Sequence, residues 1–215
     1  MNVYDFDKTI FYSDSTICFL KWCVIRHPHI LFLYLPKLFV SAILFVIKRI
    51  SVSQAVEQLL SFMKFVPNLE GEIESFWEKY EKKISPWYLK QKKEDDLIIS
   101  ASPEFFLRPI IKKLNVQLIG TQLDLQTGKI VGRCCYGKQK VKNLILSEFF
   151  TNLHIDEFYS DSFSDFPLSL CAQKAFLVVK HGKKVKSWPK ISMKTTEKIQ
   201  KTKLYFFLYS HMSLN

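Results

Sequence analysis

The chain has 215 residues, of which 48% are hydrophobic and 15% aromatic, and it carries a formal net charge of +11. This composition excludes a disordered chain and fits one large domain, or a core domain with a smaller insertion. The charge is mostly lysine without a nucleic-acid-binding motif, so we expect no nucleic-acid partner; an anionic membrane surface, a phosphorylated substrate and a solvated basic surface all stay open.

The first predicted element is a short buried strand over residues 1–6. In the segment NVYDFDKTIF, apolar residues come first and two carboxylates, Asp5 and Asp7, come after them at the end of this strand. A strand buried in a parallel sheet delivers the residues at its carboxyl end to the edge of the sheet where ligands bind. The pair therefore marks a candidate site.

A helical pattern follows from about Ser15 to Lys93, and we expect it to form one α-helical cap over residues 15–93. Its most apolar part, residues 30–47, contains Lys37 and Pro36, which count against a free-standing membrane span. Two interpretations stay open: a re-entrant or interfacial pair of helices at a membrane, and a helix pair buried in the cap. Ser51 or Ser53 is the expected N-cap of the next helix.

Strand and helix patterns alternate after this insertion. DLIISAS, VQLIG, IDEFYS and KAFLVV predict strands, PEFFLRPIIKKL and KQKVKNLILSEFF predict helices, and LDLQTGKIVGRCC predicts a hairpin. The order predicts an α/β fold with a parallel sheet flanked by helices, formed by residues 1–14 and 94–190. Residues 191–215 are a basic C-terminal tail to which we assign no structure.

Four polar clusters fall at the predicted strand ends or helix starts. They are Asp5 with Asp7, Ser100, Lys140 with Lys138 nearby, and Asp161 with Asp165. Since the carboxyl ends of parallel strands meet at one edge of a sheet, we expect these clusters to lie together. The KVKNL context favours Lys140 over Lys138.

These residue types fit phosphoryl transfer. Asp5 would attack phosphorus as a carboxylate nucleophile, and because its charge repels the phosphate, a divalent cation must bridge the two. Oxygen ligands suit Mg²⁺. Asp161 would complete the metal set, with Asp165 as a further ligand or as the partner of a ligand.

The other members of the set would handle the phosphate and the proton. Lys140 would neutralise the phosphate oxygens and keep Asp5 ionised, and the Ser100 hydroxyl would donate to the same oxygens. Asp7 would then act as general acid to the leaving alcohol, and as base to the water that hydrolyses the aspartyl phosphate.

Together, DFDKT, LIISAS, KVKNL and SDSFSD resemble, in order, the four motifs of the haloacid dehalogenase (HAD) superfamily, in its phosphoserine-phosphatase-like branch. The resemblance implies a Rossmann-like core with a helical cap inserted after the first motif. It also implies an HAD-type phosphatase, a phosphoric monoester hydrolase that works through an aspartyl phosphate. Mg²⁺ would be held by Asp5, the backbone carbonyl of Asp7 and Asp161.

The residues of the predicted cap indicate the class of substrate. Asp14 lies nine residues beyond Asp5, where phosphoserine phosphatases carry a cap carboxylate, but Arg26 and Arg49 lack the context of their substrate arginine. The apolar cap is similar to that of the phosphatidylglycerophosphatase C enzymes. We therefore expect a lipid phosphate such as phosphatidylglycerophosphate and peripheral membrane contact through the cap. A small soluble phosphomonoester, or a catalytically silent membrane-associated binding module, is the alternative.

The cysteines and the first residues bear on the compartment. Five cysteines without a CxxC pair argue against a disulfide framework and a zinc site. No signal-peptide pattern precedes MNVYDF. We expect a cytoplasmic protein, at the inner face of the membrane if the cap contacts lipid.

Overall fold

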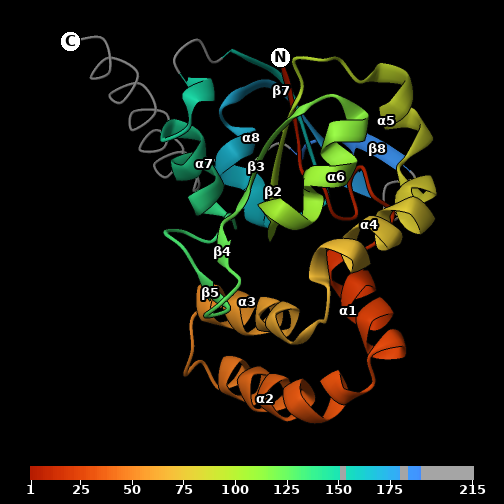
Figure 1. The fold of residues 1–215 in the computed structure, drawn as a ribbon. Helices are drawn as coiled ribbons and strands as arrows, with labels where there is room; N and C mark the ends of the chain where they lie inside the picture. The colour runs from red at the N-terminus through yellow and green to blue at the C-terminus, as the bar shows by residue number, and fades with distance from the viewer. Residues whose placement is uncertain (151–153, 180–183, 190–215) are drawn as a thin grey trace.

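The computed structural model describes residues 1–150, 154–179 and 184–189, and its centre is a six-stranded sheet (Figure 1). The strands are, in chain order, β1 Asn2–Tyr4, β2 Leu97–Pro103, β3 Gln117–Thr121, β6 Ile155–Ser160, β7 Ala172–Val179 and β8 Lys184–Ser187. They lie in the order β3-β2-β1-β6-β7-β8. All neighbouring pairs are parallel except β7 and β8. The predicted α/β class with a parallel sheet is confirmed.

The antiparallel edge strand β8 was not predicted from the sequence. Its sequence KVKS is short and alternates lysine with other residues, which blurs the signal of a buried strand. Lysine-rich, short strands are typical of sheet edges, where charge discourages pairing with another chain. The predicted tail, residues 191–215, lies outside the described residues.

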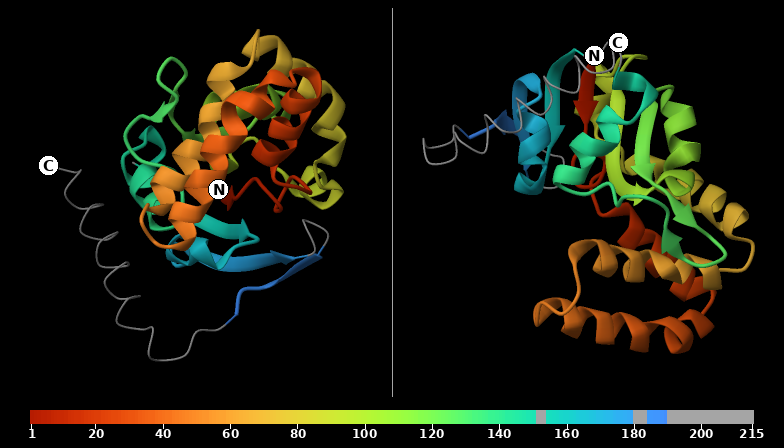
Figure 2. Two further views of the ribbon diagram at one scale, coloured as in Figure 1. Left: turned by 90° about the horizontal axis from the view of Figure 1, so that it is seen from below. Right: turned by 90° about the vertical axis from the view of Figure 1, so that its left-hand side faces the viewer.

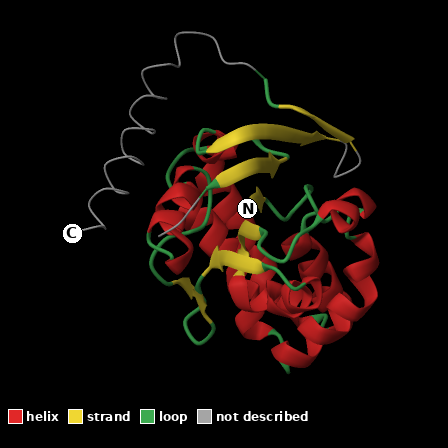
Figure 3. Ribbon diagram, turned by 90° about the horizontal axis from the view of Figure 1, so that it is seen from above, coloured by secondary structure: helices red, strands yellow, loops and turns green. Residues whose placement is uncertain are grey.

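Helices cover both faces of the sheet (Figure 3). Side chains alternate along each strand, so that Tyr4 and Ile98 face one hydrophobic core, and Val3 and Leu97 face the other. The first core includes residues of α5 (Pro86–Gln91) and α6 (Glu104–Leu114); the second includes residues of α7 (Lys138–Ile145) and α8 (Phe166–Ser169). The central strand β1, with the sequence NVY, is thus buried on both sides, as is typical of a strand inside a parallel sheet.

The chain between β1 and β2 is helical. It contains α1 Ser15–Arg26, α2 His29–Val46, α3 Val52–Leu60, η1 Ser61–Phe65, α4 Leu69–Tyr80 and η2 Glu81–Lys83, followed by α5. Aromatic rings join this cap to the core: Phe19 of α1 and Phe76 of α4 both pack against Phe106 of α6. The indole N–H of Trp77 also donates to the Phe106 carbonyl at 2.6 Å. α2 and α3 lie at the end of the molecule remote from the sheet (Figures 1 and 2).

The apolar cap segment forms one helix, α2, and not the expected pair of helices. Pro36 lies inside α2, where it removes one backbone hydrogen bond. Its side chain is exposed, so the affected turn faces away from the packed side, while Ile30 and Tyr34 are buried and hold the helix in place. α3 begins at the expected N-cap Ser51, whose side chain forms a capping box with Gln54.

The predicted hairpin is present as β4 (Leu123–Asp124) and β5 (Lys129–Ile130). It extends from the core to α3 of the cap (Figure 1). The backbone N–H of Ile130 donates to the Glu57 carboxylate at 2.8 Å. The cap is therefore tied to the core at a second place, far along the chain from α1.

Candidate active site

Asp5 lies one residue beyond β1, at the carboxyl end of the central strand. Its backbone N–H donates to the Tyr159 carbonyl on β6 at 2.8 Å, which extends the ladder through this residue. The chain then turns sharply: the Phe6 carbonyl accepts from three backbone N–H groups further on, and Lys8 adopts φ 57°. This turn separates the environments of Asp5 and Asp7.

Lys140 lies between two buried carboxylates. Its Nζ donates to Asp5 Oδ1 at 2.5 Å and to Asp165 Oδ2 at 2.6 Å, and only 3% of Lys140 is exposed. Burial alone would lower the pKa of Lys140, but Asp5 and Asp165 outweigh it and raise that pKa. The lysine is a fixed positive charge at the sheet edge.

Gly137 positions this lysine. It is the N-cap of α7, with φ 55° and ψ −129°, a conformation that strongly favours glycine. The helix that follows presents Lys140 in its first turn. Lys138 is exposed, so the structure brings Lys140, and not Lys138, to the carboxylates.

Burial and the neighbouring charges act in opposite directions on Asp5. Burial raises the pKa of Asp5, Lys140 lowers it, and the carboxylates Asp165 and Asp161 raise it again. The site thus gathers more negative charge than the one lysine neutralises. Such an excess favours a further cation among these oxygens.

Thr9 joins the residue after β1 to the residue after β6. Its hydroxyl donates to Asp5 Oδ2 at 3.3 Å and accepts from the Asp161 backbone N–H at 3.0 Å. Asp165 is held in turn by the Ser160 hydroxyl, which donates to its Oδ2 at 2.8 Å. Asp161 follows β6 directly, and Asp165 ends the short helix η4 (Phe163–Asp165).

Asp7 has separate partners. Its Oδ1 accepts from the Ser15 backbone N–H at 2.6 Å, and its Oδ2 accepts from the Ser102 hydroxyl at 2.7 Å. Burial and the nearby Asp14 carboxylate raise the pKa of Asp7 to about 6, although both hydrogen bonds oppose this. A carboxyl with that pKa can hold or release a proton near neutral pH, as a general acid–base must.

Ser100 lies within β2 and is buried. Its hydroxyl oxygen accepts from the Ser102 N–H at 3.1 Å. Asp14 is the N-cap of α1, and its carboxylate accepts from the Ile17 N–H at 3.0 Å. Asp14 therefore contributes to the start of the cap whatever its relation to substrate.

Sequence reasoning missed four residues that organise this site: Thr9, Ser102, Gly137 and Ser160. The signal for Thr9 was present, because it closes the DFDKT segment. Ser102 follows Ser100 at a spacing of two, which in a strand can place both hydroxyls on one face. The role of Gly137 depends on backbone geometry, so it has no local signal. Ser160 lies five residues before its partner Asp165, in the same segment.

The oxygens at the strand ends suit a hard divalent cation. Over residues 1–150, 154–179 and 184–189, no three His, Cys, Asp or Glu side chains are grouped to hold a metal ion by themselves. The Asp5 and Asp161 carboxylates would supply two oxygen ligands, and the backbone carbonyl of Asp7 a third. Thr9 joins Asp5 to the backbone N–H of Asp161. This set matches the preference of Mg²⁺, which keeps waters and binds phosphate oxygens at its other positions.

Two histidines at the end of α1 and the start of α2, and two cysteines before α7, have structural surroundings. His27 Nε2 contacts the Glu72 carboxylate at 3.0 Å, and His29 Nε2 contacts the Phe65 carbonyl at 3.2 Å. Cys134 and Cys135 are buried near the start of α7. Burial raises the pKa of both thiols, which disfavours the reactive thiolate.

An open parallel sheet with carboxylates, a buried lysine and hydroxyls gathered beyond its carboxyl ends defines an α/β enzyme architecture with its site at the strand ends. The family model of the haloacid dehalogenase-like hydrolases matches residues 3–169. The chain belongs to this family of hydrolases.

Solved structures share the fold. A protein of unknown function from Bordetella pertussis Tohama I is 19% identical, with a TM-score of 0.65 over 81% of this chain and 87% of that one. A phosphoserine phosphohydrolase-like protein from Francisella tularensis is 17% identical, with a TM-score of 0.54 over 81% and 86%. A probable phosphoserine phosphatase from Vibrio cholerae is 14% identical, with a TM-score of 0.58 over 96% and 66%. Among curated proteins, no sequence matches this chain significantly.

Proposed function

We propose that the protein is a Mg²⁺-dependent phosphatase that hydrolyses a phosphate monoester through an aspartyl phosphate on Asp5. The 2.5 Å contact between Lys140 and Asp5 carries this proposal, because it places a fixed cation beside a strand-end carboxylate. That cation attracts the phosphate oxygens and favours the ionised, nucleophilic form of Asp5. A silent binding module would have no need of this costly buried charge cluster.

The chain's own residues account for both half-reactions. In the first, an Asp5 oxygen forms a bond to phosphorus, the bond from phosphorus to the ester oxygen breaks, and Asp7 gives its proton to the leaving alcohol. In the second, Asp7 takes a proton from water, whose oxygen attacks phosphorus and releases Asp5 and inorganic phosphate. Ser102 keeps the Asp7 carboxyl oriented through both steps.

Asp5, Asp161 and the Asp7 carbonyl would hold Mg²⁺. When bound, the ion supplies charge neutralisation between the Asp5 carboxylate and the phosphate. Asp165 supports Lys140 in this arrangement, since its carboxylate oxygen accepts from both Lys140 and Ser160.

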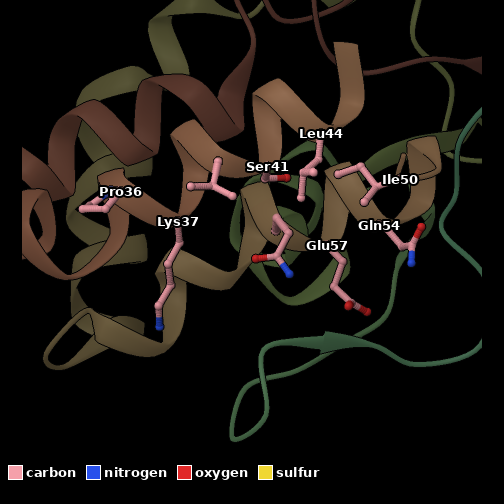
Figure 4. A pocket seen from close by; sticks show the side chains of 9 residues that line it. Pro36, Lys37, Ser41, Leu44, Ile50, Gln54 and Glu57 are labelled. Atoms are coloured by element: carbon pink, nitrogen blue, oxygen red, sulfur yellow. The ribbon is translucent and has the colours of Figure 1, made fainter. Parts of the chain in front are cut away.

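We propose a lipid phosphate, such as phosphatidylglycerophosphate, as the substrate. A groove of about 520 Å³ between α2 and α3 supports this choice (Figure 4). Its α2 side is largely apolar, including Val40 and Leu44, and its α3 side is polar, with Gln54 and Glu57. An amphipathic molecule fits such a lining.

A second groove lies between α3 and the start of α7. Gln54 and Glu57 line it as well, together with Cys134 and Gln139, and Gln139 directly precedes Lys140 in the chain. The two grooves thus meet on α3, between the apolar cap and the phosphate-binding lysine. With a lipid substrate, the protein would work at the inner face of the cytoplasmic membrane.

A small soluble phosphomonoester is the second candidate. Two of the similar structures are described as a probable phosphoserine phosphatase and a phosphoserine phosphohydrolase-like protein. Against it, Arg26 of the cap binds Glu72 at 2.8 Å and so is engaged within the cap. Arg26 is therefore a poor candidate for binding a substrate carboxylate.

A phosphatase panel tests the proposal. Purified protein is assayed with p-nitrophenyl phosphate, phosphoserine, phosphatidate and phosphatidylglycerophosphate, each with and without Mg²⁺ and lipid vesicles. We expect Mg²⁺-dependent phosphate release that is fastest on a vesicle-borne lipid phosphate and is abolished by Asp5→Asn. No release from any substrate contradicts the enzyme proposal, and fast turnover of soluble phosphoserine contradicts the lipid substrate.

A further inference from the structure

One side of α2 exposes a continuous row of large apolar side chains. The row, called here the α2 stripe, consists of Phe32, Phe39, Ile43 and Val46, which are 82%, 68%, 47% and 78% exposed. At 3.6 residues per turn these positions fall within an arc of about 60° of the helix surface. Isolated exposed apolar residues are ordinary, but a contiguous row of this length marks an interaction surface.

The opposite side of α2 is fixed to the cap. Ile30, Tyr34 and Ser41 are buried there, and the Tyr34 hydroxyl contacts the carbonyls of Gln58 and Leu59 at 2.7 Å each. The burial of this side and the exposure of the α2 stripe are therefore set by the same packing. The helix cannot hide the stripe by rotating without breaking the Tyr34 contacts.

The segment of the cap that carries the stripe is basic. Between residues 27 and 65 the cationic side chains are Lys37, Lys48, Arg49 and Lys64, and the single acidic side chain is Glu57. Glu57 is engaged with the Ile130 N–H of the hairpin. An exposed apolar row on a segment with a net positive charge is complementary to a lipid surface that carries negative headgroups above an apolar interior.

We propose that the α2 stripe docks the protein onto an anionic lipid bilayer, with α2 lying in the plane of the interface. By length and composition α2 could also cross a bilayer, and among the described residues it is the one helix that could. Crossing would require α2 to leave α3 and to bury the Tyr34 side of the helix in lipid. Lying flat keeps those contacts, because α3 runs beside α2 on the side toward the sheet (Figure 2).

A second copy of the chain is the competing occupant, and the charge argues against it. A symmetric pairing through the α2 stripe would bring two cation-rich caps together, which electrostatic repulsion opposes. The bilayer instead offers the opposite charge. Docking on the bilayer does not depend on the phosphatase activity. The benefit of docking for catalysis, which is to bring the site to lipid substrates, rests on the proposed function.

Vesicle cosedimentation tests the proposal. Wild-type protein is expected to bind vesicles that contain phosphatidylglycerol, and to bind pure phosphatidylcholine vesicles and high-salt samples more weakly. The double variant Phe39→Asp with Ile43→Asp should lose at least about ten-fold in binding. Leu146→Asp is the control, because Leu146 directly follows α7 of the core, is 66% exposed and should not affect binding.

Two further measurements keep the outcomes distinct. Turnover of soluble p-nitrophenyl phosphate reports folding and chemistry, and it should be equal in wild type and the double variant. One tryptophan is added at a time, by Phe32→Trp or Val46→Trp, and the quenching of wild type, which has four tryptophans of its own, is subtracted. With lipids brominated at known depths, the two added tryptophans should be quenched at the same shallow depth. Unchanged vesicle binding by the double variant would overturn the proposal. Different depths of the tryptophans at positions 32 and 46 would overturn it as well, and so would a wild-type dimer that fails to bind vesicles.

Discussion

The hydroxyl of Ser102 donates a 2.7 Å hydrogen bond to the Asp7 carboxylate and so joins the end of β2 to the loop after β1. This bond favours the ionised form of Asp7 and opposes the effect of burial on its pKa. Ser102→Ala should therefore raise the pKa of Asp7 above the value of about 6 that it has with this hydrogen bond.

The expected effect is on the pH profile of phosphatase activity. The proposed general acid must be protonated when the alcohol leaves, so the alkaline limb follows the pKa of Asp7. In Ser102→Ala this limb should move to higher pH, and kcat should fall about ten-fold because Asp7 is less well oriented. Thr16→Val is the control, since the Thr16 hydroxyl contacts Ser102 at 3.0 Å but does not contact Asp7. An identical profile in Ser102→Ala and wild type would contradict the assignment.

Lys140→Met should remove both activity and stability. Without the lysine, Asp5 and Asp165 are left as two buried carboxylates without their cation, and breaking such a buried pair costs about 3 kcal/mol of unfolding free energy. We expect kcat/KM to fall by at least about a thousand-fold, since phosphate binding and the ionised nucleophile both depend on this charge. Urea unfolding and steady-state kinetics measure the two effects.

Lys138→Met provides the matched control for that variant. Lys138 is two residues away on the same helix and exposed, so its loss should change the unfolding free energy by less than about 0.5 kcal/mol. If Lys138→Met were inactive and Lys140→Met active, the assignment of the lysine would be reversed.

The sequence predicted which polar residues lie together, because residues of the right chemical type occur at the ends of predicted strands and at the start of a predicted helix. Asp5, Lys140 and Asp165 lie far apart in the chain, yet each follows a strand or opens a helix, and the structure brings the three side chains into contact. The course of the apolar cap was less predictable. The apolar segment predicts a pair of helices, but packing of the Tyr34 side holds one continuous helix with Pro36 inside it.

The supporting residues depended on tertiary geometry. Thr9 joins Asp5 to the Asp161 backbone, which is 152 residues away in the sequence. The DFDKT segment marks Thr9 itself, but no local pattern reports its contact with a residue at that distance. The same holds for β8, whose pairing with β7 decides its structure more than its own lysine-rich sequence does.

Gly137→Ala should move Lys140 away from the carboxylates. A side chain at φ 55° and ψ −129° is strained by about 1–3 kcal/mol, and relief of the strain would tilt the start of α7. We expect a loss of stability in that range and a raised KM for p-nitrophenyl phosphate. Gly132→Ala is the matched control: Gly132 also has positive φ, 73°, but an added Cβ would meet nothing within 4 Å. Equal effects of the two variants on KM would argue that Gly137 does not position the lysine.

Glu72 holds the start of α4 to the end of α1, and its loss should loosen the cap. Its carboxylate accepts from the Trp22 indole at 2.7 Å, from Arg26 at 2.8 Å and from His27 at 3.0 Å. Although burial works against the charged form, these hydrogen bonds lower the pKa of Glu72 below its ordinary value. Glu72→Gln should reduce the free energy of unfolding by about 2 kcal/mol at pH 7, as expected for hydrogen bonds to a charged group.

The pH dependence of this effect follows from the direction of the pKa shift. A carboxyl with a lowered folded-state pKa stabilises the protein fully above its unfolded pKa, and this contribution disappears as pH falls through the folded pKa. The difference in unfolding free energy between wild type and Glu72→Gln should therefore be constant near neutrality and shrink below about pH 4. Glu70→Gln is the control, because Glu70 lies in the same first turn of α4 but is exposed. A difference between wild type and Glu72→Gln that persists unchanged at the lowest pH would show that Glu72 acts through packing and not through its charge.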